Sequence, residues 1–77
     1  MNYCKFLDWL QQEKSMNIRS AKDVVSRLKR AMIIINNTEV TNESLQLLNS
    51  KSEFLSLSMS VKSQLRRSIT LYSEFSK

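Results

Sequence analysis

Apolar residues recur at three- and four-residue steps along most of this chain, which places them on one face of an α-helix. The first such stripe predicts a helix over about Asn2–Gln12, with Trp9 at the margin of the stripe. Its members are Tyr3, Phe6, Leu7 and Leu10. Residues 13–19 are mostly polar and predict a loop after this helix.

A second stripe follows the clearest start signal in the chain. Ser20 and Asp23 approximate a capping box, in which the serine oxygen accepts a hydrogen bond from a free backbone N–H of the first turn. We therefore expect the second helix to begin at Ser20 and to stop at residues 36–38. Ile33 and Ile34 widen its apolar surface, so this end packs deep in the core or against a partner. The stripe itself consists of Val24, Val25, Leu28, Ala31, Met32 and Ile35.

The region 41–59 predicts short helices. Thr41 is a cap candidate for one of them, and Ser50 with Glu53 forms an S-x-x-E capping box before Phe54. These two signals leave open whether the region holds two short helices or one kinked helix. Serines alternate with apolar residues over 56–61, a spacing typical of a strand, but no second strand is available to pair with it.

A last helix is expected from about Ser60. Its apolar positions are Val61, Leu65, Ile69, Tyr72 and Phe75, with Leu71 beside them. The chain contains no repeat and no long linker, so we predict a single all-α domain over residues 1–77.

Composition argues against catalysis and against metal binding. The chain has no Gly and no Pro, which disfavours tight hairpins and phosphate-cradling loops. It has no His, hence no ordinary general base near neutral pH, and Cys4 is its only cysteine. We therefore expect no enzymatic activity, no cofactor, no metal site and no internal disulfide.

The same composition predicts a cytoplasmic protein without a membrane segment. A small domain without disulfides fits a reducing compartment. The first ten residues include Lys5 and Asp8 and lack the apolar core of a signal peptide. The longest apolar run, Ala31–Ile35, is far too short to span a bilayer.

Charge is segregated along the chain, whose net charge is +5. Residues 14–30 hold six basic side chains and one acid, residues 39–53 hold three acids and one lysine, and residues 62–67 hold three basic side chains and no acid. Two basic helices could neutralise the phosphates of double-stranded DNA, although charged helix faces are also common without any ligand. The candidate DNA-binding residues are Lys22, Arg27, Lys29, Arg30, Lys62, Arg66 and Arg67.

The order of these features resembles the N-terminal core-binding (SAM-like) domain of phage integrases and other tyrosine recombinases. That family opens with F-x-x-W/Y-L, matched by residues 6–10, and continues with a Ser-capped basic helix, matched by residues 20–30. A variable region follows, here residues 41–59. The last helix resembles L-x-x-A-x-x-x-Y-x-x-F, matched by residues 65–75 with Ser68 in place of the alanine. The aromatic often found within the family's second helix is Val24 or Val25 here.

The resemblance implies a small orthogonal bundle of four to five helices that clamps one face of DNA with its second and last helices. Those are the two basic helices of this chain. The recombinase catalytic domain does not fit in 77 residues, and Tyr72 occupies an apolar helix position, so it is not expected to act as a nucleophile. The alternative is a small helical regulatory or protein-interaction domain of a phage or mobile element, which would bind its partner through Trp9 or the apolar patch Ile33–Ile35.

Overall fold

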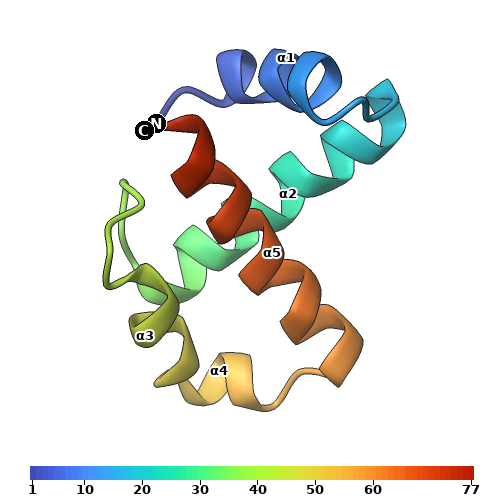
Figure 1. The fold of residues 1–77 in the computed structure, drawn as a ribbon. Helices are drawn as coiled ribbons and strands as arrows, with labels where there is room; N and C mark the ends of the chain where they lie inside the picture. The colour runs from blue at the N-terminus through green and yellow to red at the C-terminus, as the bar shows by residue number, and fades with distance from the viewer.

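A computed structural model describes all residues from 1 to 77 and contains five helices and no strand. The all-α prediction and the rejection of a strand over 56–61 are therefore confirmed. Figure 1 shows α5 crossing α2, with α1 across one end of this pair and α3 and α4 at the other. The helices are α1 (Tyr3–Glu13), α2 (Ile18–Ile35), α3 (Ser44–Asn49), α4 (Ser52–Leu55) and α5 (Met59–Phe75).

The start of α2 differs from the sequence prediction. The side-chain oxygen of Asn17 accepts a hydrogen bond from the backbone N–H of Ser20 at 2.8 Å. Asn17 is therefore the N-cap, and the prediction that Ser20 caps this helix was wrong. Asparagine caps a helix as well as serine does, so the cap moves three residues towards the N-terminus, and the loop before the helix shortens.

The end of α2 follows the prediction. Asn36 adopts the left-handed conformation at φ 55°, which asparagine tolerates better than most residues. The N–H of Asn37 then donates to the carbonyl of Met32 at 3.1 Å and satisfies one of the free carbonyls of the last turn. Residues 36–38 therefore stop the helix as predicted.

The region between α2 and α5 forms two short helices, which settles that alternative. Thr41, the predicted cap, does not cap α3, whose N-cap is Glu43 without a side-chain hydrogen bond. The Thr41 hydroxyl instead accepts from the N–H of Glu43 at 3.2 Å in the preceding turn. The predicted capping box of Ser50 and Glu53 was wrong. The Ser50 hydroxyl instead donates to the carbonyl of Leu47 at 2.7 Å, at the end of α3. The Ser50 side chain thus satisfies a free carbonyl at the end of α3, and α4 begins without a side-chain cap.

The start of α5 lies one residue before the predicted position. The Ser58 hydroxyl accepts from the N–H of Val61 at 3.3 Å, so the first helical residue is Met59 and not Ser60. The apolar stripe of α5 faces inward as expected. Ser68 lies within that stripe and is buried, and its hydroxyl donates to the carbonyl of Leu65 at 2.6 Å. The internal hydrogen bond allows this polar side chain to lie in the core.

The core is built around one apolar strip of α2, which packs against α5. All six stripe positions predicted for α2 are buried. From α5 the core takes four apolar side chains, and from α1 it takes Phe6 and Leu10. The short helices α3 and α4 add Leu48 and Phe54. The buried residues of α2 are Ala21, Val24, Val25, Leu28, Ala31, Met32 and Ile35, and the apolar ones of α5 are Leu65, Ile69, Leu71 and Tyr72.

An aromatic cluster closes α1 onto the end of α5. The ring of Phe6 lies 5.0 Å from that of Tyr72 in an edge-on arrangement and 5.5 Å from that of Phe75, measured between centroids. Trp9 is half-buried at the margin of this cluster, as predicted, 5.7 Å from the ring of Phe75. Aromatic pairs at these distances add stabilisation beyond the area that they bury.

The two ends of the chain meet at this cluster. The backbone N–H of Asn2 donates to the hydroxyl of Tyr72 at 3.3 Å, and the termini are side by side in Figure 1. The amino group of Met1 pairs with Glu39 at 3.1 Å and so ties the loop after α2 to the start of α1. None of the helices combines the length and the apolar character needed to cross a membrane.

We predict that Asn17→Ala lowers the free energy of unfolding by about 1 kcal/mol, because it removes the hydrogen bond that caps α2. Ser20→Ala is the matched control and leaves stability nearly unchanged, since only the Ser20 backbone is used in that bond. Urea unfolding followed by circular dichroism measures both. A larger loss for Ser20→Ala than for Asn17→Ala would contradict this assignment of the cap.

We predict that Phe6→Leu lowers the free energy of unfolding by about 2 kcal/mol, because the side chain keeps its apolar character but loses its aromatic contacts. Ile33→Ala, at an exposed position, is the control and changes stability by less than about 0.5 kcal/mol. Thermal and urea unfolding of the two variants test the comparison. An equal loss of stability for Phe6→Leu and Ile33→Ala would show that the aromatic cluster contributes no more than an exposed side chain.

Candidate nucleic-acid interface

Because the apolar strip of α2 is buried in the core, the basic side of this helix faces solvent. Successive helix residues turn by about 100°, so the basic residues cover the side opposite the core. Lys22 and Lys29 lie on the flank that faces α1, and Arg27 lies on the flank that faces α5. Arg30 lies between these flanks and is exposed. All four candidate residues of α2 are therefore on one continuous outer surface, on which Asp23 is the only acid.

Arg27 and Arg67 come together although they belong to different helices. They line one open pocket of about 240 Å³ between α2 and α5. Ser20, which does not cap α2, lines the same pocket together with Asp23. The pocket is thus a polar site with two guanidinium groups and one carboxylate, and the two guanidinium groups leave a net positive charge.

Lys22 and Lys29 line a second pocket, of about 280 Å³, between α1 and α2. The ammonium nitrogen of Lys29 lies 5.0 Å from the centroid of the Tyr3 ring, a cation–π contact that holds it at the pocket. Sequence periodicity does not predict this pocket, because its two walls come from separate helices. The other lining residues are Cys4, Leu7, Val25 and Ser26.

Lys62 and Arg66 lie apart from the other five candidates. The guanidinium carbon of Arg66 is 5.7 Å from the centroid of the Phe54 ring, so this side chain lies against α4. Lys62 precedes Arg66 by one helical turn and shares its side of α5. Arg67, the next residue along, turns away towards α2. The seven predicted residues therefore do not form one surface. Lys62 and Arg66 form a separate pair, and the other five form the main basic surface, namely Lys22, Arg27, Lys29, Arg30 and Arg67.

The ion pairs of the molecule leave all seven candidates free of carboxylate partners. One pair joins the amino group of Met1 to Glu39, and the other joins Lys14 to Glu74 at 2.8 Å. Lys14 also lies 5.5 Å from the centroid of the Trp9 ring, so it belongs to the aromatic cluster. The side chains of the main basic surface therefore form no ion pair that would compete with an external anion.

The apolar patch expected for a protein partner is smaller than the sequence suggested. Met32 and Ile35 are buried in the core, and Ile34 packs partly against it. Ile33 alone is well exposed, at 77%. Trp9, the other candidate contact, is half-buried.

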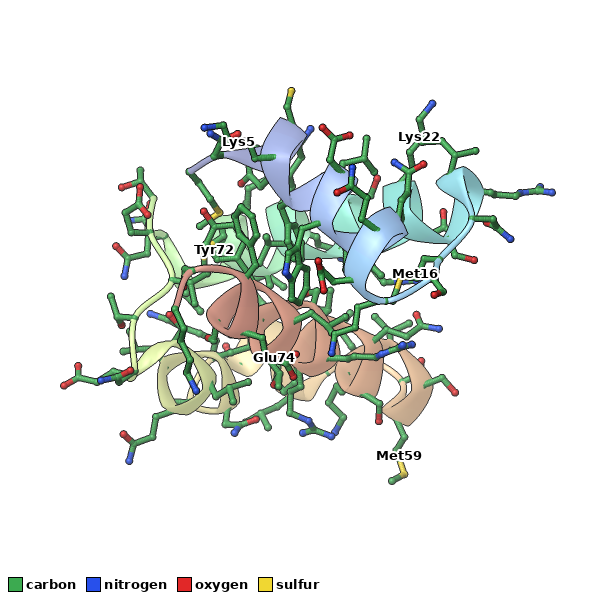
Figure 2. All side chains as sticks on the ribbon, turned by 45° about the horizontal axis from the view of Figure 1, so that its top comes forward. Lys5, Met16, Lys22, Met59, Tyr72 and Glu74 are labelled. Carbon is green, nitrogen blue, oxygen red and sulfur yellow. The ribbon has the colours of Figure 1, made fainter.

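Other exposed apolar side chains lie where α4 meets α5. Leu55 is 55% exposed and Met59 is 81% exposed. Figure 2 shows Met59 projecting away from the body of the domain. Both residues are apolar in the sequence, but only the tertiary structure reveals that nothing covers them.

Residues with catalytic or metal-binding chemistry are dispersed. No three side chains of the His, Cys, Asp and Glu types lie close enough together to hold a metal ion. The side chain of Tyr72 is buried, and its hydroxyl accepts a hydrogen bond from Asn2. Cys4 is exposed at the pocket between α1 and α2.

No protein family, curated protein or solved structure matches this chain. The functional inference therefore depends on the chemistry of the surface. Arginine and lysine on the two flanks of the solvent-facing side of α2 suit the phosphates on either side of a DNA groove, which an α-helix can enter.

The surroundings of Tyr3 also predict a pH dependence of stability. Burial raises the pKa of Tyr3 above its usual value of 10.0, and nearby Tyr72 and Glu39 raise it further. The folded protein thus holds this proton to a higher pH than the unfolded chain does. As the pH rises past 10.0, the unfolded state loses the proton first, so the contribution of Tyr3 to stability decreases between the unfolded and the folded pKa.

We therefore expect Tyr3→Phe to reduce the loss of stability above about pH 10, and to leave the pH dependence below about pH 9 unchanged. Urea unfolding at a series of pH values from neutral to alkaline measures the effect. Parallel curves for the variant and the wild type across the alkaline range would contradict it.

Proposed function

We propose that this chain is a DNA-binding domain that contacts the phosphates of double-stranded DNA through the outer surface of α2 and Arg67 of α5. The observation that carries the proposal is the shared pocket of Arg27 and Arg67, in which two helices direct guanidinium groups to one open site. Neither group pairs with a carboxylate. Guanidinium groups bind phosphate oxygens through paired N–H donors.

The layout of α2 suits the major groove. Lys22 and Lys29 on one flank, and Arg27 with Arg67 on the other, would reach the phosphates on the two sides of the groove. Arg30 lies between the flanks, where it would face the base edges. Phosphate contacts provide most of the affinity in this arrangement. Any preference for a DNA sequence comes from the contact of Arg30 with the bases.

The proposal includes the core-binding (SAM-like) fold that the sequence resembles, in a binding role without catalysis. The crossing of the second and last helices supports it, as does the burial of Ser68 at the family's small position. The interface differs from the sequence prediction in one respect. Lys62 and Arg66 lie on the α4 side of α5, so we assign them to a peripheral region outside the main contact surface.

Arg66 and Arg67 are adjacent in sequence but lie on different sides of α5, so they provide a test residue and a matched control for this proposal. The affinity for a generic duplex, measured by fluorescence anisotropy over a salt series, should fall steeply as salt rises. Arg27→Ala and Arg67→Ala should each weaken binding and lower the salt slope by about 1, since each removes one phosphate contact. Arg66→Ala, the matched control, should change the slope by much less.

Two results would overturn the proposal. One is the absence of duplex binding by the wild type at low salt. The other is an equal loss for Arg66→Ala and Arg67→Ala, which would mean that net charge matters and the surface does not. Binding that is little weakened by salt would favour the alternative of a protein-interaction domain.

A further inference from the structure

We propose that the pocket between α1 and α2 is a docking site for an acidic amphipathic helix of a partner protein. The pocket shares Lys22 and Lys29 with the phosphate contacts proposed above, but its apolar floor is separate from them, and the inference does not depend on DNA binding. It rests on the combination of an apolar floor and a cationic rim within one pocket of about 280 Å³.

The floor of the pocket suits an apolar side chain. Leu7 and Tyr3 line it from α1, and Val25 lines it from α2. All three are core residues or pack partly against the core, so the floor is held in place by the fold. A DNA phosphate that reached the lysines would leave this apolar surface uncovered, whereas a leucine or methionine side chain would fill it.

The rim of the pocket suits carboxylates. It carries Lys22 and Lys29, and no acidic residue lines the pocket. The Lys29 ammonium is held at the rim by its contact with the Tyr3 ring. The occupant must therefore be anionic at its edges and apolar at its centre.

The spacing of the two lysines selects the form of that occupant. They are seven residues apart on α2, which is two helical turns and about 10.5 Å along the axis. A partner helix with glutamates at positions i and i+7 has the same spacing. A leucine at i+3 or i+4 lies between them on the same face and would enter the pocket. The site thus fits a helix with the pattern E-x-x-L-x-x-x-E.

The position of the site has a consequence for the proposed DNA contacts. Lys22 and Lys29 also belong to the outer surface of α2, so a helix that occupies the pocket would compete with DNA for both. The partner would then act as an antagonist that reduces the affinity for DNA without touching Arg27 or Arg67.

Cys4 provides a direct readout, because it is exposed, lines the pocket and is the only cysteine. The rate of its alkylation by iodoacetamide is measured with increasing amounts of a synthetic helical peptide of that pattern. We expect the peptide to slow alkylation severalfold in a saturable manner. A control peptide with serine in place of the leucine should bind more weakly and protect Cys4 less.

Charge-reversal variants locate the site. The double variant K22E/K29E should weaken the peptide about tenfold, since two exposed ion pairs are lost. The control K62E/R66E makes the same change in net charge on the α4 side of α5, and it should leave peptide affinity nearly unchanged because salt screens distant charges. Urea unfolding verifies that both variants fold.

Three outcomes would overturn the site. The first is peptide binding without protection of Cys4, and the second is an equal loss for the two double variants. The third is protection of Cys4 by duplex DNA and not by the peptide, which would assign the pocket to nucleic acid. Failure of DNA binding in the salt series leaves the peptide result unaffected, so the two proposals fail separately.

Discussion

The packing of the apolar strip of α2 against α5 is the interaction on which the rest of the structure depends. Seven side chains of this one helix enter the core, and α5 supplies the surface opposite them. Without that pair, α1 with 11 residues and α3 with six residues are too short to be stable helices in water. A domain of this size also buries only a small apolar area, so few other contacts could replace the packing of α2 against α5.

The same packing determines where charge can lie. Cations avoid the core because their dehydration is costly, so the basic side chains occupy the flanks and the outer surface of the two long helices. Arg66 and Arg67 show that one step along α5 is enough to change the side on which a charge lies. The guanidinium group of Arg66 is on the α4 side, and that of Arg67 is on the α2 side. The half-buried Arg66 lies over the ring of Phe54, as long basic side chains often cover apolar surface.

Helical periodicity in the sequence was enough to predict the core. Every predicted stripe position of α2 is buried, because the apolar face of a long amphipathic helix leaves water only by packing against the other helices. The helix starts were less predictable, since Asn17 and Ser20 are equally good caps and only the folded loop selects between them. Likewise, Ser50 matched a capping box, but its hydroxyl donates to the carbonyl of Leu47 at the end of α3 and does not cap α4.

The candidate site was harder to predict than the core, because it depends on how helices cross. Periodicity shows that Arg27 and Arg67 are on the surface, but their shared pocket results from the crossing of α2 and α5. The separation of Arg66 depends on Phe54, which is distant in sequence. The pocket of Lys22 and Lys29 depends on α1, which carries no signal of its own for binding.

The hydrogen bond between Asn2 and Tyr72 joins the beginning of the first helix to the end of the last. A polypeptide with adjacent ends can be opened elsewhere and rejoined across a short linker, or placed within a surface loop of another protein, without rearranging its core. Any segment attached to either end would leave the domain from the same point on its surface. The fold is thus suited to modular use, in which it is inserted as a unit.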